Sequence, residues 1–261
     1  MSSRACLAIA IVLLLGRDAA GQTGGVQRVE GGIVRGPTER RQLAVVFTGH
    51  EFAEGVSTIL DALADRGAKA SFFLTGVFLR DRARAPLVAR MVRDGHYLGP
   101  HSDAHLLYAP WTGPKVTLVS RDAFAADLER NLDALRPFGV PRAQARFFLP
   151  SYEWYTEDIA RWTREAGLTL IGHTPGTRSN ADYTEEGTPQ FVASATIFES
   201  ILRREREDAH GLNGFILLLH VGAGPRRADK FHLRFAELLD ALARRGYGFV
   251  RVDELLAKTH R

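Results

Sequence analysis

The sequence predicts an α/β protein whose parallel strands roll up into a barrel, and three observations carry this prediction. Apolar runs of strand length alternate with amphipathic windows of helical spacing about seven times from residue 43 onward. The chain is 45% hydrophobic, which suffices for a large buried core. No repeat, low-complexity tract or internal boundary divides it. Strands that alternate with helices form parallel sheets, because each helical crossover returns the chain to the same end of the sheet.

The expected elements follow one another as pairs of a strand and a helix. The first strand is expected at 43–47, and the helix after it ends at a glycine cap, Gly67. Its apolar residues recur at helical spacing (Val56, Ile59, Leu60 and Leu63). The further pairs, each written strand before helix, are 69–75 with 86–95, 96–99 with 121–136, 145–149 with 156–167, 168–172 with 196–207, 214–220 with 229–245, and 247–252 with a short closing helix.

The N-terminus is predicted to lie outside this fold. Residues 1–21 are interpreted as a secretory signal peptide, because Arg4 precedes an apolar run at 5–15 and small residues follow at 19–21. The run is shorter than the roughly 20 apolar residues that span a bilayer. We therefore expect an exported protein, periplasmic or secreted, with no membrane span in the mature chain; a retained N-terminal anchor is the alternative.

Two further expectations concern the organisation of the mature chain. Residues 22–41 are rich in glycine and charge and lack periodicity, so they are expected to form a flexible leader to a single domain at 42–261. The longest non-periodic stretches inside that domain, 106–119 and 173–192, are interpreted as functional loops.

Composition excludes several kinds of site. The formal charge is +4, but acidic and basic residues are interspersed, so no basic stripe predicts a nucleic acid partner. The one cysteine, Cys6, lies inside the signal peptide. The mature chain therefore has no disulfide, no thiolate metal ligand and no cysteine nucleophile, and a bound metal would need His, Asp or Glu.

Four polar clusters follow the ends of predicted strands. They are His50 with Glu51, HSDAH at 101–105, LPSYEWY at 149–155, and His220 at the end of GFILLLH. In parallel β/α architectures the loops at the carboxyl ends of the strands share one face, where ligands bind. We therefore expect the clusters to meet, although a lone histidine in such a place can also be a satisfied core residue.

HSDAH is the strongest metal signal. The spacing of His101 and His105 lets both imidazoles lie on one side of a helical turn, which is typical of zinc or a related divalent ion. Two neighbouring surface histidines are the alternative. Asp103, between them, is interpreted either as a residue that orients an imidazole or as a loop cap.

Four blocks, in their order along the chain, resemble polysaccharide deacetylases, carbohydrate esterase family 4. They are AKASFFLTG (68–76), Gly-Pro followed by HSxxH (99–105), the strand leading into LPSY (149–152), and ILLLH (216–220). The resemblance covers about residues 43–252 and implies a distorted (β/α)7-8 barrel of the polysaccharide deacetylase type. It also implies that His101 and His105 bind the metal, that the segment before Tyr152 walls the substrate groove, and that His220 is the general acid.

The first motif departs from the family. Polysaccharide deacetylases carry two adjacent aspartates after the first strand, one the base and the other the third metal ligand, whereas an ungapped register places Thr48 and Gly49 there. A shift of two residues offers His50 and Glu51 instead. We favour a set in which Glu51 joins the two histidines as metal ligand, with His50 or Glu51 as base or His50 as a fourth ligand. Favourable charge at a helix N-terminus is the alternative for Glu51, and also for Glu54.

The wall segment departs as well. Leu149 stands where the family carries an arginine that supports the base, and the two linked departures indicate a divergent subfamily. Tyr152 is expected to bind substrate, with a backbone N–H near it holding the oxyanion. Trp154 is expected to stack on a sugar ring, unless it packs in the core. Asp182 is expected to contact substrate or to tune His220, unless it belongs to an ordinary turn.

The expected function is removal of N-acetyl groups from an amino-sugar polysaccharide or oligosaccharide. The expected partner is thus an acetylated glycan, and the expected cofactor is a divalent metal, zinc. The alternatives are a carbohydrate O-acetyl esterase and a catalytically impaired carbohydrate-binding protein. A glycoside hydrolase is a weaker alternative, because it needs two carboxylates, and Glu51 with Glu153 is the best pair available.

Overall fold

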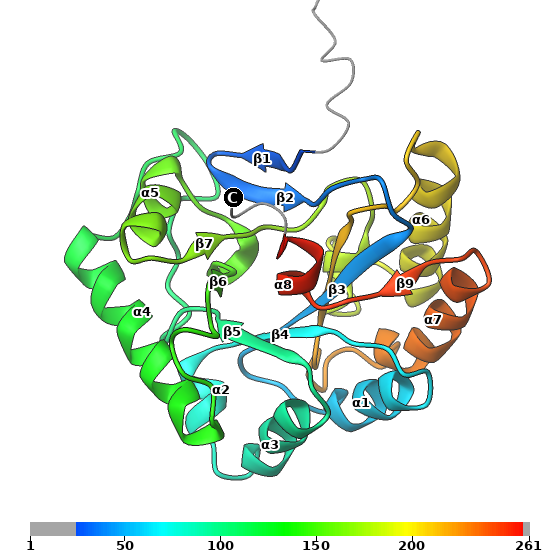
Figure 1. Ribbon diagram of the computed structural model, residues 1–261, viewed down its shortest axis with the longest axis horizontal. Coiled ribbons are helices and arrows are strands. Elements are labelled where there is room, and N and C mark those ends of the chain that lie inside the picture. Colours follow the sequence, from blue (N-terminus) through cyan, green and yellow to red (C-terminus); the bar gives the residue numbers. More distant parts are fainter. Residues whose placement is uncertain (1–24, 258–261) are drawn as a thin grey trace, which may run out of the picture.

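The computed structural model describes residues 25–257 (Figure 1). The predicted signal peptide lies outside these residues. The strands are β1 (Gln27–Val29), β2 (Gly32–Arg35), β3 (Gln42–Gly49), β4 (Ser71–Leu74), β5 (Tyr97–Pro100), β6 (Phe147–Phe148), β7 (Thr169–Leu170), β8 (Ile216–His220) and β9 (Gly248–Phe249). Parallel pairing joins them in the order β5-β4-β3-β8, with β9 also on β3, and joins β6 to β7.

Single hydrogen bonds and bridges close this sheet into a distorted barrel. Leu149 N donates to Pro100 O across 3.3 Å and so links the ends of β5 and β6. An isolated parallel bridge joins Ile33 of β2 to Ile171, and an antiparallel bridge joins Arg35 to Phe215 beside β8. The predicted barrel is therefore confirmed, but its seam is a strand that the sequence analysis assigned to the leader.

That part of the expected leader belongs to the domain. All four residues of β2 are buried, and Ile33 is 1% exposed. The Arg35 guanidinium forms an ion pair with Asp208 at 3.0 Å. β2 is only four residues long, and its two adjacent apolar residues, Ile33 and Val34, are too few to show a strand pattern. It forms a strand because it fills the gap between β7 and β8.

Helices surround the barrel, as Figure 1 shows, and confirm the expected alternation. They are α1 (Val56–Ala64), α2 (Gly76–Arg80), α3 (Ala85–Arg93), α4 (Arg121–Leu135), α5 (Glu157–Glu165), α6 (Ser194–Glu207), α7 (Phe235–Ala243) and α8 (Val252–Leu255), with short 3-10 turns η1 (Arg136–Phe138), η2 (Ser151–Glu153), η3 (Ser179–Ala181) and η4 (Phe231–Arg234). Within residues 25–257, no helix has the length and apolar character needed to cross a membrane.

Strand alternation decides which side chains reach the mouth of the barrel. Ala44 and Val46 of β3 pack inside the barrel, whereas Val45 and Phe47 pack against the surrounding helices. Thr48 continues the inner series. A Cβ on Gly49 would instead meet Leu74, Val221 and Phe78, all in the outer core.

Candidate active site

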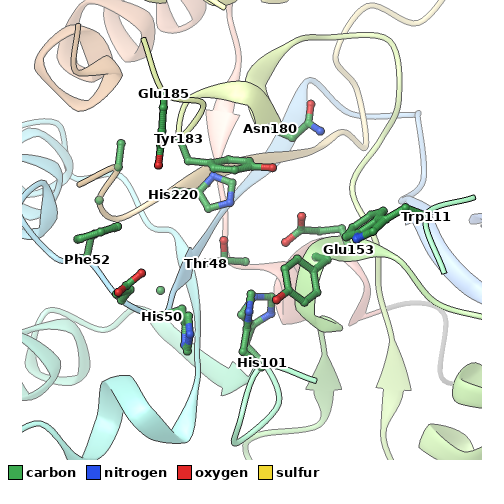
Figure 2. A pocket seen from close by; sticks show the side chains of 16 residues that line it. Thr48, His50, Phe52, His101, Trp111, Glu153, Asn180, Tyr183, Glu185 and His220 are labelled. Atoms are coloured by element: carbon green, nitrogen blue, oxygen red, sulfur yellow. The ribbon is translucent and has the colours of Figure 1, made fainter. Parts of the chain in front are cut away.

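The carboxyl ends of β3, β5, β6 and β8 open into one cavity of about 520 Å³ (Figure 2). Its lining includes members of all four polar clusters: His50, Glu51, His101, His105, Tyr152 and His220. The expectation that these clusters meet on one face is confirmed. The reason is the shared direction of the parallel strands, which brings every strand end to the same side.

His101 and His105 lie together on the loop after β5, with ring centroids 5.3 Å apart. His101 is 2% exposed, and its Nδ1 donates to the Leu149 carbonyl at 2.7 Å. Because the proton sits on Nδ1, Nε2 keeps its lone pair, as in histidines that bind metals. Burial, reinforced by neighbouring histidines, lowers the pKa of His101 well below its usual value and that of His105 to about 3. Both imidazoles are therefore neutral, which is the form that binds metal.

The loop is not the helical turn that the spacing of the two histidines suggested. Ser102 and His105 adopt left-handed backbone, with φ of 67° and 57°. Two buried side chains of α4 hold this shape. Asp127 accepts from the Ser102 hydroxyl at 2.7 Å and from the backbone N–H groups of Asp103 and Ala104 at 2.8 and 3.0 Å. Asn131 accepts from the backbone N–H of His101 at 2.7 Å.

Neither of these two α4 residues was predicted from the sequence to have a role. Asp127 and Asn131 are four residues apart and fall on the same side of the helix as Phe124, Leu128 and Leu132, which are buried. Polar residues on an apolar helix face were the signal that could have found them. Asp103 pairs with Arg80 at 2.6 Å and with Arg130 at 3.3 Å, so it anchors the loop to two helices.

Replacing Asp127 with alanine is expected to destabilise the protein by about 3 kcal/mol, because three hydrogen-bond donors, two of them buried, lose their acceptor. Urea unfolding checks this, with a lower midpoint and an unchanged slope expected. The matched control is Asp133→Ala on the same helix, where the carboxylate is 69% exposed and the change should stay within about 0.5 kcal/mol. Equal midpoints for the two variants would contradict the role given to Asp127.

His220 and Asp182 form the second functional unit. The Asp182 carboxylate accepts from His220 Nδ1 at 2.6 Å and from the His220 backbone N–H at 2.9 Å. Burial alone would lower the pKa of His220, but the charge and hydrogen bond of Asp182, helped by Glu153, raise it above its ordinary value. Asp182 is 5% exposed. Asp182 was expected either to contact substrate or to tune His220, and its hydrogen bonds favour the second role.

The first turn departs from the expected geometry. The His50 ring stacks on His105 with centroids 4.3 Å apart and an interplanar angle of 10°. Imidazole lone pairs lie in the ring plane, so two parallel rings cannot both aim at one ion about 2 Å away. His50 Nδ1 also lies 3.2 Å from the Thr75 hydroxyl.

Glu51 lines the cavity with an exposed side chain. Among residues 25–257, no three His, Cys, Asp or Glu side chains come together as a metal-binding group. The structure therefore assembles the two imidazoles of the expected set without its carboxylate. Glu54 accepts from the backbone N–H groups of Ala223 and Gly224, both at 2.8 Å, so it ties a loop rather than capping α1.

Aromatic side chains line the mouth of the cavity. Trp111 is 60% exposed, Tyr152 42% and Tyr183 51%, and all three belong to the lining. Trp154 is engaged elsewhere, because its Nε1 donates to the Pro110 carbonyl at 3.1 Å and the Lys115 ammonium lies 3.7 Å above its ring. Trp111, stacked on Trp154 at 6.2 Å, is thus the better placed of the two for a sugar ring.

Glu153 also lines the cavity, although the sequence predicted no part for it in deacetylation. Its backbone φ is 51°, next to 60° at Tyr152. Desolvation raises the pKa of its carboxyl to about 7, with opposing contributions from His220 and Asp182. Sequence spacing gave no sign of it, since both residues lie in a strained turn whose direction only the fold determines.

This chain is similar to proteins with named activities over most of its length. A chitooligosaccharide deacetylase of Sinorhizobium fredii is 26% identical over 200 residues, 72% of this chain and 80% of that protein. A peptidoglycan-N-acetylglucosamine deacetylase of Bacillus cereus is 26% identical over 224 residues, which cover 86% of this chain and 92% of that protein. A carbohydrate esterase family 4 pseudoenzyme from Bacillus anthracis has a similar structure, with a TM-score of 0.67 at 16% identity, covering 87% of this chain and 69% of that one.

The family itself follows from the first half of the domain. The model of the polysaccharide deacetylase family matches residues 35–171, more than half of the chain. The match includes β3 to β7, and with them the loop of His101 and His105 and the turn of Tyr152. The chain therefore belongs to the polysaccharide deacetylase family.

Proposed function

We propose that this protein is a metal-dependent hydrolase that removes acetyl groups from the amino sugars of a polysaccharide or oligosaccharide. The observation that carries the proposal is the pairing of two units across one cavity. The neutral imidazoles of His101 and His105 lie on one side, and the His220–Asp182 pair lies on the other. The activities named for the two curated relatives support the same substrate class.

Two of the histidines fit a divalent metal. His101 presents an unprotonated Nε2 because its Nδ1 is held by a carbonyl, and His105 is neutral beside it. We propose zinc, because neutral imidazoles are among its usual ligands. The third ligand is proposed to come from Glu51 or His50 by a side-chain rearrangement. The ion, when bound, would polarise the acetyl carbonyl and acidify a water molecule.

His220 is suited to protonate the departing nitrogen. Asp182 holds the Nδ1 proton, so the other ring nitrogen is the one left for substrate, and it raises the pKa of the imidazole. A protonated imidazole matters more for an amine leaving group than for an alcohol, because an expelled amide anion is far more basic. This favours N-deacetylation over O-acetyl ester hydrolysis.

Substrate would reach the reacting groups past the aromatic mouth. Trp111, Tyr152 and Tyr183 present exposed rings on the cavity wall, which suits the apolar faces of sugar rings. The backbone near Tyr152 is proposed to hold the oxyanion. We also propose that the protein is exported, on the basis of the apolar run at residues 5–15.

A catalytically impaired carbohydrate-binding protein is the second candidate. Thr48 and Gly49 stand in the register of the family's two aspartates, and the described residues hold no three-membered metal group. A structurally similar protein is named as a pseudoenzyme. If this candidate is right, oligosaccharides bind in the cavity without turnover.

Acetate release separates these candidates. The zinc-loaded protein is expected to release acetate from N-acetylated chitooligosaccharides or peptidoglycan faster than from acetylated xylan. Chelation should abolish the release, and added zinc should restore it. Faster release from xylan would establish the esterase, and binding without release from any of the three would establish the impaired protein.

A further inference from the structure

The end of β3 leaves a polar atom unpartnered in the cavity wall. Thr48 is 2% exposed, and within residues 25–257 its Oγ1 is a buried atom with no hydrogen-bond partner. Its place in the register of the sheet is directly beside His220 of β8. Beside His220, β3 therefore presents a neutral hydroxyl and no carboxylate, so the proton acceptor has to come from another element.

Another loop supplies a carboxylate to the cavity that Thr48 and His220 line. Figure 2 shows the Glu153 carboxylate pointing into the cavity, on the side where Thr48 and His220 also lie. Glu153 follows β6 by way of the short turn η2, and its backbone N–H donates to the Pro150 carbonyl at 3.0 Å. The loop is pinned on its far side by Trp154, whose Nε1 donates to Pro110 O at 3.1 Å.

Glu153 is held in the cavity by an unfavourable backbone conformation. Left-handed conformations at Tyr152 and Glu153, with φ of 60° and 51°, cost about 1 to 2 kcal/mol for each non-glycine residue. Such strain persists where the surrounding structure imposes it. A glycine at either position would relieve the strain, but a glycine at 153 would carry no carboxylate.

The charges around Glu153 suit a proton acceptor. No ion pair joins its carboxylate to a lysine or arginine in the described part of the chain. The titratable groups that act on it are His220 of β8, Asp182 beside η3, and Tyr183 of the same loop. Desolvation raises its pKa to about 7, close to the value that best serves a general base at neutral pH.

We propose that Glu153 is the general base of the deacetylation, supplying from the loop after β6 the carboxylate that β3 lacks. This inference rests on the function proposed above. Glu51, the other carboxylate weighed for the role, is exposed at the cavity edge. In this proposal the base comes from the loop after β6 and not from the end of β3.

The step balances with the residues present. A water oxygen bonds to the acetyl carbon while one of its protons passes to the Glu153 carboxylate. The C–N bond then breaks as protonated His220 gives its proton to the nitrogen, so that acetic acid and a free amine leave. The proton on Glu153 returns to His220 through solvent, which restores both groups.

Kinetics of two Glu153 variants test the inference. Glu153→Gln in the zinc-loaded enzyme should lower kcat by about 100- to 10,000-fold with little change in KM. Calorimetric binding of an N-acetylated chitooligosaccharide should be retained. The matched control is Glu157→Gln, which removes an exposed carboxylate at the start of α5, outside the cavity; it should keep wild-type kcat.

A second variant guards against a loss caused by misfolding. Glu153→Ala leaves a space that formate can enter, so added formate should raise its turnover at least about tenfold, whereas Glu153→Gln should not respond. The double variant Thr48→Asp/Glu153→Gln should also regain turnover, because it returns a carboxylate to β3.

The outcomes separate this inference from the proposed function. Acetate release by the wild type with full kcat in Glu153→Gln would overturn the role of Glu153 and leave the function standing. Failure of both formate and the Thr48 aspartate to restore turnover would overturn it too. A wild type that releases no acetate from any acetylated glycan would remove the proposed function, and the inferred step with it.

Discussion

Replacing His220 with alanine is expected to lower kcat for an N-acetylated oligosaccharide by about 100- to 10,000-fold. Without the imidazole the departing nitrogen has no proton donor. Asp182 cannot replace it, because this carboxylate is buried and serves as the hydrogen-bond acceptor for His220. KM should change little, because the loss falls on the transition state. Steady-state acetate release at saturating zinc measures both constants.

The partner residue gives this prediction its pH test. Asp182→Asn keeps the imidazole but removes the charge that raises the pKa of His220. A general acid works only below its pKa, so activity falls as pH rises through that value. The variant should therefore lose activity at lower pH than the wild type does. An unmoved alkaline limb, or full activity in His220→Ala, would contradict the assignment of His220 as the acid.

Replacing His101 with alanine is expected to remove both the metal and the activity. One imidazole, that of His105, would then remain of the pair that the structure brings together. Loss of a residue that only hydrogen-bonds a metal ligand weakens metal binding by roughly 10- to 100-fold. Loss of a direct ligand from so small a set should weaken metal binding by far more. Elemental analysis after dialysis should find an equimolar ion in the wild type and none in the variant, with acetate release falling in parallel.

A distant histidine is the control for that experiment. His210 is exposed in the turn after α6 and outside the cavity lining, so His210→Gln should retain both metal and turnover. Retention of a full equivalent of metal by His101→Ala would show that the loop after β5 does not hold the ion.

Much of the fold could be predicted from the sequence because its signals are local. The alternation of apolar runs and helical windows arises from residues a few positions apart, and it located α4, α5 and α6 to within about two residues at each end. The same logic predicted that His101, His105 and His220 would meet, since each ends or follows a strand and parallel strands share a direction.

The parts that sequence reasoning missed depend on neighbours distant in the chain. β2 is a strand because it closes a gap between β7 and β8, and four residues carry no period from which to predict it. Asp127 and Asn131 looked like ordinary helix residues until α4 packed against the loop after β5. The stacking of His50 on His105 likewise arises only when two loops meet.

By itself, the sequence determined the α/β alternation, the pair of imidazoles after β5 and the histidine at the end of β8. Each of these follows from short-range patterns and from the positions of strand ends. The tertiary structure alone decided which carboxylate points into the cavity that these histidines line. Strand alternation turned Gly49 toward the outer core, and a left-handed turn aimed Glu153 into the cavity. The direction of a side chain at a strand end or in a strained turn depends on the packing around it, and this packing cannot be predicted from the local sequence.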